Sequence, residues 1–225
     1  MSAIPITKSN SSSKQKPRGF TVVELMIVIV VIAILVAITI FGYGAVRSRS
    51  LNTARLAAGK EMMEILNTYV AINQDYPRHD SNNDRISDAC IGEGYTSWDG
   101  DSTPDCNAKG LYVVSTKDEL NNKLRKVTGS LPIVPQEIMK SNASGVSYRG
   151  ISYFANGQHV DGALGENAII FVFLEGANLD CGAPVLVRSG PPGSGQYATS
   201  SSAKNTEVDG NVTRCTFMVD SPRDY

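Results

Sequence analysis

Residues 18–38 read Arg18-Gly19-Phe20-Thr21-Val22-Val23-Glu24-Leu25-Met26-Ile27-Val28-Ile29-Val30-Val31-Ile32-Ala33-Ile34-Leu35-Val36-Ala37-Ile38. A basic stretch ends in glycine, an aromatic residue follows, and one carboxylate heads an apolar run that carries no other charge. The run continues to Phe41. At ~1.5 Å per residue, a helix from Phe20 to Phe41 is roughly 33 Å long, enough to cross the hydrocarbon core of a bilayer. The sequence therefore predicts one membrane-spanning helix over residues 20–41.

A cleaved signal peptide is the alternative interpretation of this run. Gly42-Tyr43-Gly44 before Ala45 has the small-x-small pattern of a signal cleavage site. Two features favour a retained span, because the run exceeds the ~7–15 residues of a usual signal core and Glu24 interrupts its start. Basic residues flank both ends of the run, since Arg47 and Arg49 follow it closely, so charge bias does not fix its orientation.

Residues 1–19 form a separate segment, rich in Ser, Asn and Lys, with four basic residues and no acidic one. Such a segment cannot bury a core, and we expect a disordered targeting leader. Without it the chain has 17 basic residues (21 − 4) against 22 acidic ones, a net charge of −5. The near-neutral whole chain lacks the basic footprint of a nucleic-acid-binding protein, and nucleic acid stays an open question as a partner.

The apolar pattern changes after Gly42 and Gly44, which weaken the helix where it should leave the membrane. Apolar residues then recur at spacings of mostly three and four, which marks one face of an amphipathic helix. The pattern stops at Asp75-Tyr76-Pro77, because a proline biases its predecessor out of the helix. We expect one helix from about Phe20 to about Gln74, whose second half needs a partner surface in the rest of the chain. The apolar positions of that half are Val46, Leu51, Ala54, Ala58, Met62, Ile65, Leu66, Tyr69 and Ile72.

The chain has four cysteines, with no C-x-x-C pair and no histidine near any of them. An even count behind a membrane segment favours two disulfides in an oxidising compartment over four buried free thiols. Four cysteines allow three connectivities, of which sequence proximity favours Cys90–Cys106 and Cys181–Cys215.

Short strand patterns dominate the last third of the chain. Residues 168–175 give the best strand, and Asn156-Gly157 after the strand candidate 147–155 is a hairpin signal. The other expected elements are strands at 111–114, 184–188 and 213–219, a helix capped by Thr116 and Glu119 and ended by Gly129, and flexible or loop-like stretches at 78–109 and 190–202. The expected fold is α+β, a long N-terminal helix packed on a small antiparallel sheet with disulfide-tied loops. Its divisions are a leader (1–19), a transmembrane helix (20–41), an amphipathic helix (42–76) and a globular head (77–225).

Catalytic and metal-binding patterns are sparse. The two histidines, His79 and His159, stand in loop-like context, and no nucleophile elbow or phosphate-binding loop occurs, so we expect no enzymatic activity and no cofactor. Calcium is a weak candidate at Asp99, Asp101 and Asp105, whose oxygen atoms are suitable ligands. Their spacing lacks a full ligand ladder, and turn formation is the alternative role.

Glu24 needs a physical explanation, because a carboxylate inside hydrocarbon costs roughly a few kcal/mol and normally has a partner. The span carries no basic side chain. A cut between Gly19 and Phe20 would create an α-amino group four residues before Glu24. That cation could pair with its own carboxylate or with that of a neighbouring chain. The alternative is a glutamate at the headgroup level, stabilised by the helix N-terminal dipole.

The segment from Arg18 to Leu25, followed by an apolar helix, resembles the N-terminus of type IV pilins and the related pseudopilins. The resemblance covers about Pro17 to Phe41, and the Tyr76-Pro77 end of the long helix is also typical of that family. It implies cleavage after Gly19 by a prepilin peptidase, N-methylation of Phe20, and pairing of Glu24 with the N-terminus of an adjacent subunit. It also implies assembly of a helical homo-oligomeric filament by a platform protein and ATPases of the inner membrane.

The resemblance thus predicts a structural subunit of a type IV pilus that serves adhesion, twitching motility or DNA uptake. The alternatives are a pseudopilin of a type II secretion system and a minor tip pilin that binds DNA or a surface. The protein is expected as a single-pass protein of the cytoplasmic membrane before assembly, and in an extracellular pilus at the cell surface afterwards. The mature length of 206 residues (225 − 19) and the two expected disulfides favour the pilin.

Overall fold

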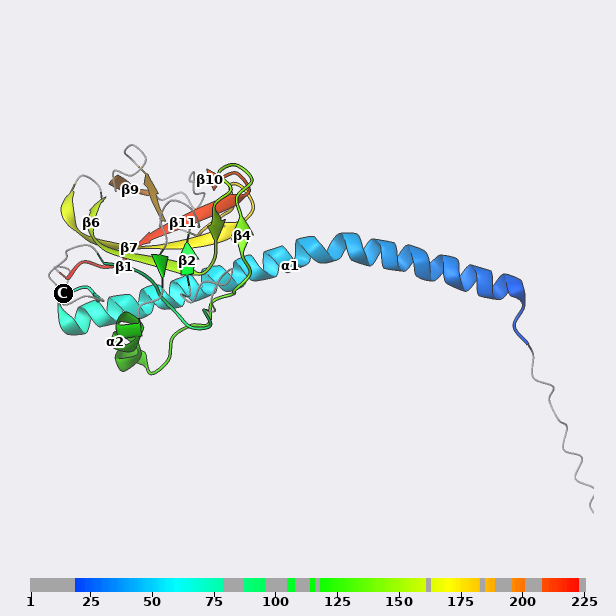
Figure 1. The fold of residues 1–225 in the computed structure, drawn as a ribbon, viewed down its shortest axis with the longest axis horizontal. Coiled ribbons are helices and arrows are strands. Elements are labelled where there is room, and N and C mark those ends of the chain that lie inside the picture. Colours follow the sequence, from blue (N-terminus) through cyan, green and yellow to red (C-terminus); the bar gives the residue numbers. More distant parts are fainter. Residues whose placement is uncertain are drawn as a thin grey trace, which may run out of the picture. The chain divides into compact units, whose positions relative to one another are not determined.

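The structure is a computed structural model that describes residues 19–78, 87–95, 105–107, 114–115, 118–160, 163–182, 185–188, 196–200 and 208–222. The chain divides into two compact units, Met1–Val46 and Arg47–Tyr225. We call them the N-terminal unit and the globular unit. The fold is α+β, with one long helix, a second short helix and small, mainly antiparallel sheets, as the sequence predicts (Figure 1).

Helix α1 spans Val22–Asn73, close to the expected limits of Phe20 and Gln74. Gln74 follows it with a φ of 55°, and its backbone N–H donates to the carbonyl of Val70 at 2.8 Å. A left-handed residue with such a bond is a common way to end a helix, and Pro77 prevents its continuation. Among the described residues, α1 is the one helix long and apolar enough to cross a membrane.

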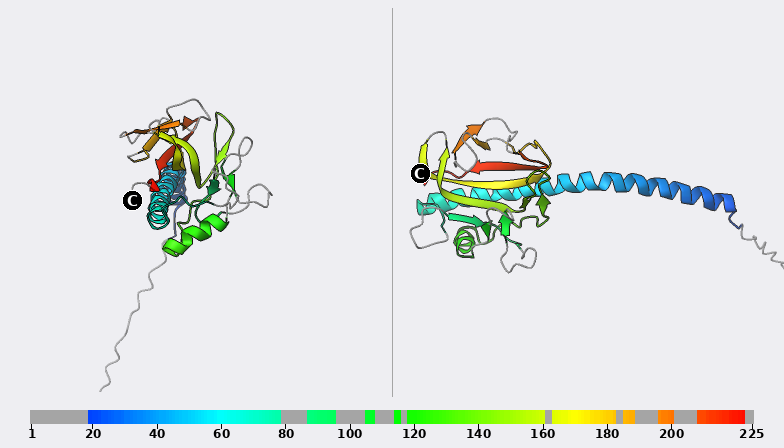
Figure 2. Two further views of the ribbon diagram at one scale, coloured as in Figure 1. Left: turned by 90° about the vertical axis from the view of Figure 1, so that its left-hand side faces the viewer. Right: turned by 45° about the horizontal axis from the view of Figure 1, so that its top comes forward.

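The globular unit is built around the second half of α1, which carries one buried face. Ala58, Met62, Ile65, Leu66 and Val70 are buried there. They belong to the first of two main hydrophobic cores, together with one side of the large sheet. Figure 2 shows α1 end-on between the sheet and the short helix α2. The second half of α1 therefore has the partner surface that its amphipathic pattern requires.

The large sheet has seven strands in the order β1-β6-β7-β11-β8-β9, with β10 paired to β11. Its pairings are antiparallel, except that β9 also pairs in parallel with β6. The strands are β1 (Ser87–Cys90), β6 (Ile151–Val160), β7 (Ala163–Glu175), β8 (Val185–Arg188), β9 (Gln196–Ser200), β10 (Val208–Asp209) and β11 (Val212–Met218). A smaller antiparallel sheet, in the order β3-β2-β5-β4, consists of β2 (Asp105–Asn107), β3 (Val114–Ser115), β4 (Met139–Lys140) and β5 (Ser147–Tyr148).

Strand β7 lies at the centre because both of its faces are buried. Ala168, Ile170, Val172 and Leu174 point into the core shared with α1. The alternate residues Ile169, Phe171 and Phe173 point into a second core on the other face, with Met139, Leu186 and Val212. A strand that is covered on both sides reads as an uninterrupted apolar run, which is why residues 168–175 give the clearest strand signal in the sequence.

Helix α2 (Asp118–Thr128) buries Leu120 and Leu124 in the core shared with α1. Its buried Asn121 accepts a hydrogen bond from the backbone N–H of Gly92 at 3.2 Å and donates to the Gly92 carbonyl at 3.4 Å. Gly129, with a φ of +82°, ends the helix as expected. The expected cap at Thr116 lies outside the described residues.

Three expectations about the sheet are wrong. Asn156-Gly157 is not a hairpin turn, because β6 continues to Val160 and shifts register between Ala155 and Gln158. The Asn-Gly pair therefore lies in an irregular stretch inside a strand, where residues that tolerate unusual backbone angles are also favoured. The stretch 190–202, expected to be flexible, contains β9, and the loop-like stretch 78–109 contains β1 and β2.

Both expected disulfides are present. Cys90 pairs with Cys106 at an S–S distance of 2.05 Å, and Cys181 pairs with Cys215 at 2.00 Å. All four cysteines are buried. The first bond joins β1 of the large sheet to β2 of the small one, and the second joins the segment after β7 to β11. The division of the chain at residues 19, 41 and 76 stays a prediction.

Candidate functional site

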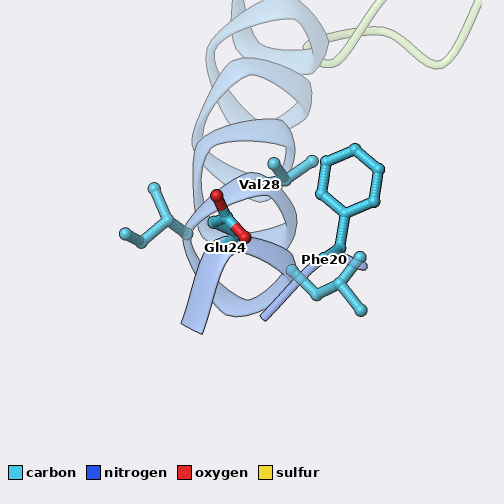
Figure 3. A pocket seen from close by; sticks show the side chains of 5 residues that line it. Phe20, Glu24 and Val28 are labelled. Atoms are coloured by element: carbon cyan, nitrogen blue, oxygen red, sulfur yellow. The ribbon is translucent and has the colours of Figure 1, made fainter. Parts of the chain in front are cut away.

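The three residues that the sequence singles out for processing and assembly lie at the start of α1 and just before it. Gly19 and Phe20 precede the helix, and Glu24 lies in its first turn. Glu24 and Val28, four residues apart, lie on one side of the helix, and Phe20 lies next to them just before its start (Figure 3). Together with Leu25 and Ile27 they line a hollow on the helix surface.

Thr21 and Glu24 cap the helix reciprocally. The backbone N–H and the hydroxyl of Thr21 both donate to Oε2 of Glu24, at 2.8 and 2.9 Å, and the N–H of Glu24 donates to the Thr21 hydroxyl at 3.2 Å. This is a capping box, which satisfies backbone groups that the first turn otherwise leaves without partners. This capping box was not among the features predicted from the sequence, although the Thr-x-x-Glu spacing of residues 21–24 signals it.

The carboxylate of Glu24 thus has hydrogen-bond donors but no cation among the described residues that surround it. Every large apolar side chain from Val22 to Ile40 is at least 49 % exposed. A helix that is apolar all round is stable only inside a core or a membrane. In either setting the charge on Glu24 favours a nearby cation, because the low dielectric strengthens the attraction.

The bond between Gly19 and Phe20 lies in the segment just before the helix. Among the described residues, no atom outside the chain neighbours of Gly19 lies within 4 Å of a Cβ built there, and Phe20 is 83 % exposed. The bond predicted for cleavage therefore lies outside the helix. The predicted cleavage would leave a new α-amino group on Phe20, one residue before the capping box.

The remaining predicted site residues lie elsewhere or outside the described residues. The four cysteines form the two disulfides of the globular unit. Asp99 and Asp101 fall outside the described residues, and only the backbone of Asp105 is described, in β2. The part of the chain that the structure describes contains no cluster of three side chains suited to a metal ion.

A second hollow lies beside α2 in the globular unit, lined by Gly92, Glu93, Gly94, Tyr95, Asp118, Asn121 and Arg125. Several of its polar groups have partners within the chain. Arg125 Nε lies 2.9 Å from Oε1 of Glu93, and Asn121 is bonded to the backbone of Gly92. These contacts explain how α2 is held in place and indicate no chemistry.

Residues 14–40 match the family model described as the prokaryotic N-terminal methylation motif. This motif is the prepilin signature of type IV pilins and pseudopilins. Neither the search of curated proteins nor the search of solved structures found a match to the chain. The motif supports a type IV pilin-like or pseudopilin precursor, which implies processing by a prepilin peptidase and assembly into a pilus.

Proposed function

We propose, from the prepilin signature at residues 14–40, that this protein is a structural subunit of a type IV pilus rather than an enzyme. The observation that carries the proposal is that this motif coincides with the start of α1. There the Gly19–Phe20 bond is open, and the carboxylate of Glu24 has no cation beside it among the described residues. In this proposal the peptidase cuts after Gly19 and methylates Phe20. The apolar half of α1 then leaves the lipid for the core of a helical filament.

Glu24 has a defined role in the proposed assembly. A carboxylate that leaves the headgroup region for an apolar filament core loses hydration, and an adjacent α-amino group restores an opposite charge. The amino group of Phe20 in a neighbouring copy provides that cation and sets the register between copies. Until then the capping box with Thr21 satisfies the carboxylate oxygen locally.

The substitution Glu24→Gln tests this role sharply. Glutamine still forms a capping box with Thr21, so the helix start is preserved while the charge is removed. We expect normal leader cleavage but loss of nearly all filaments sheared from cells that carry the peptidase and the assembly machinery. Thr39→Val in the same span is the control, because it removes a hydroxyl that bonds only to the Val36 carbonyl. Normal filaments from Glu24→Gln would show that the charge is dispensable.

A pseudopilin of a secretion system is the second candidate, because it shares the same motif. Filament abundance separates the two candidates. A pilus subunit accumulates in long surface fibres composed mainly of this protein, whereas a pseudopilin supports secretion without them. Adhesion, motility and DNA uptake belong to the first candidate as possible roles of the fibre.

A further inference from the structure

The first buried residue of α1, among those that the structure describes, is an arginine. Arg55 is 1 % exposed, although arginine is almost never fully buried without a charged partner. No carboxylate of the described residues lies within ion-pair distance of its guanidinium. Its buried Nε also has no hydrogen-bond partner in that part of the chain. Burial lowers the pKa of Arg55, while the charges of Glu137 and Glu175 act in the opposite direction.

The two terminal nitrogens of Arg55 bond to different segments. Nη1 donates to Oδ1 of Asn52 on the same helix, and Nη2 donates to the backbone carbonyl of Glu137, both at 3.1 Å. Glu137 belongs to the stretch 129–138, which runs from α2 to β4 across α1 (Figure 1). Arg47 also approaches Glu137, at 3.7 Å, but both side chains are exposed, so this ion pair contributes little. Arg55 is therefore the buried connection between α1 and this stretch.

Asn52 extends the connection to the large sheet. Its Oδ1 also accepts a hydrogen bond from the backbone N–H of Glu175 at 2.9 Å, and its Nδ2 donates to the Glu175 carbonyl at 2.8 Å. Glu175 is the last residue of β7. Asn52 and Arg55 lie three residues apart, on one side of α1. One amide and one guanidinium thus join α1, the end of the central strand and the stretch 129–138.

The stretch 129–138 is held differently at its two ends. Near α2, the N–H of Val134 donates to the Glu93 carbonyl at 3.2 Å, and the N–H of Glu93 donates to the Pro132 carbonyl at 3.0 Å. The side chain of Val134 is also buried in the first core. Towards β4, none of residues 135–138 is buried. The attachment of this second end therefore depends on the polar contact with Arg55.

Overall stability does not explain an arginine at this position. Taking a charge out of water is costly, and replacing a buried charge by an apolar side chain of similar volume is often neutral or stabilising. A methionine would fill much of the same volume without that cost. It would lack the donors of the guanidinium, which lie in one plane and fix the geometry of each bond. Arg55 therefore contributes a specific attachment rather than overall stability.

We propose that Asn52 and Arg55 form a latch, a conformational device that keeps the stretch 129–138 and the end of β7 closed on α1. Helix α1 is continuous from Val22 to Asn73, so a displacement of its apolar half reaches the globular unit through these first turns. The latch controls local opening of this region, whereas the two cores control global unfolding. This inference goes beyond the proposed pilus and does not depend on it.

Hydrogen exchange of the full chain in detergent, read by mass spectrometry, tests the latch. Arg55→Met removes the donors but keeps a long apolar side chain. We expect peptides over 47–58 and 129–138 to exchange roughly tenfold faster or more, the effect of losing a hydrogen bond from a charged group. Peptides over 168–173 in β7 and the denaturant midpoint should not change. Arg49→Met is the control, because Arg49 is exposed and its side chain has no recorded contact among the described residues.

Asn52→Ala tests the same latch from its other member, and the core stays intact because Asn52 is only half-buried. It should accelerate exchange in the same peptides, and the double variant should fall short of the product of the two single effects. Multiplying effects would mean two independent contacts and overturn the latch, as would an Arg55→Met variant that exchanges like Arg49→Met. Acceleration that includes residues 168–173, or failure of Arg55→Met to fold, would assign Arg55 to overall stability and also overturn the proposal.

Discussion

The two halves of α1 follow the same backbone rules but differ in where their partners lie. From Val22 to Ile40 apolar side chains point in every direction and stay largely exposed within the chain. From Arg47 to Asn73 one face is buried against the sheet, and the exposed residues are mainly polar. The first half therefore depends on lipid or on other copies, whereas the second half is stabilised by contacts encoded in its own chain.

The largest expected effect is on leader cleavage, from a substitution at Gly19, just before the first half of α1. Gly19→Val should retain the leader and abolish the mature form, because the peptidase must accommodate the residue before the cut. Since the space around Gly19 is open, the fold itself tolerates the new side chain. Gly44→Val is the matched control, as nothing lies within 4 Å of its Cβ either. Intact mass spectrometry reads both, and a mature mass beginning at Phe20 in Gly19→Val would refute the processing site.

In the globular unit, which packs around the second half of α1, we expect a substitution with a large effect on the free energy of unfolding and no effect on leader cleavage. Replacing both Cys181 and Cys215 by alanine removes a buried disulfide that closes a loop between β7 and β11. The free energy of unfolding should fall by about 2–5 kcal/mol, the usual cost of losing a native disulfide. Denaturant unfolding of the full chain in detergent measures it. Unchanged stability would contradict the stabilising role of the disulfide. A loss of leader cleavage would contradict the independence of the two halves.

A substitution where α1 closely approaches β7 should have a smaller effect on the free energy of unfolding. A Cβ on Gly59 would lie 2.5 Å from Cγ2 of Val172, so a side chain there overpacks the first core. Gly59→Leu should lower the free energy of unfolding by about 1–3 kcal/mol, despite the better helix propensity of leucine. Adding Val172→Ala should recover part of the loss, and a double-mutant cycle measures the coupling. Strictly additive effects would mean that the contact does not limit packing.

The smallest expected effect on stability comes from a contact between two hairpins of the globular unit. The hydroxyl of Tyr148 donates to Oδ2 of Asp209 at 2.7 Å, and that of Ser144 donates to the same oxygen. Burial acts to raise the pKa of Asp209, but hydrogen bonds from Ser144, Tyr148 and Ser141 outweigh it and leave the pKa below its ordinary value of 3.8.

A lowered carboxylate pKa means that Asp209 contributes stability above pH 3.8, which is lost as the pH falls through the folded-state pKa. Asp209→Asn should therefore be less stable than wild type at pH 7, with the difference shrinking below pH 3.8. Urea unfolding at both pH values measures this. A difference that does not change with pH would assign the effect of the substitution to shape rather than charge.

Much of this fold follows from local signals in the sequence. The limits of α1 depend on the apolar run after Phe20 and on Asp75-Tyr76-Pro77, which act within a few residues of themselves. The pairing Cys181–Cys215 followed from proximity, and β7 followed from a run buried on both faces. The methylation motif over residues 14–40 was recognisable for the same reason, because a motif is a local pattern.

Features that depend on a partner strand were not predictable in this way. Asn156-Gly157 has the chemistry of a turn, yet its neighbours pair with Asn167 and Ala168 and the strand continues. Strand β9 lacks the alternation of apolar and polar residues that marks a strand in a sequence. It is a strand because its backbone pairs with β8 and β6.

The central claim is that cleavage between Gly19 and Phe20 converts a membrane anchor into an assembly element. Intact and peptide mass spectrometry of the native protein, sheared from the cell surface, tests it most directly. The account predicts a chain that begins at Phe20, carries the mass of one N-terminal methyl group, and retains both disulfides. A surface protein that begins at Met1, or at Ala45 after a signal-peptidase cut, would contradict it.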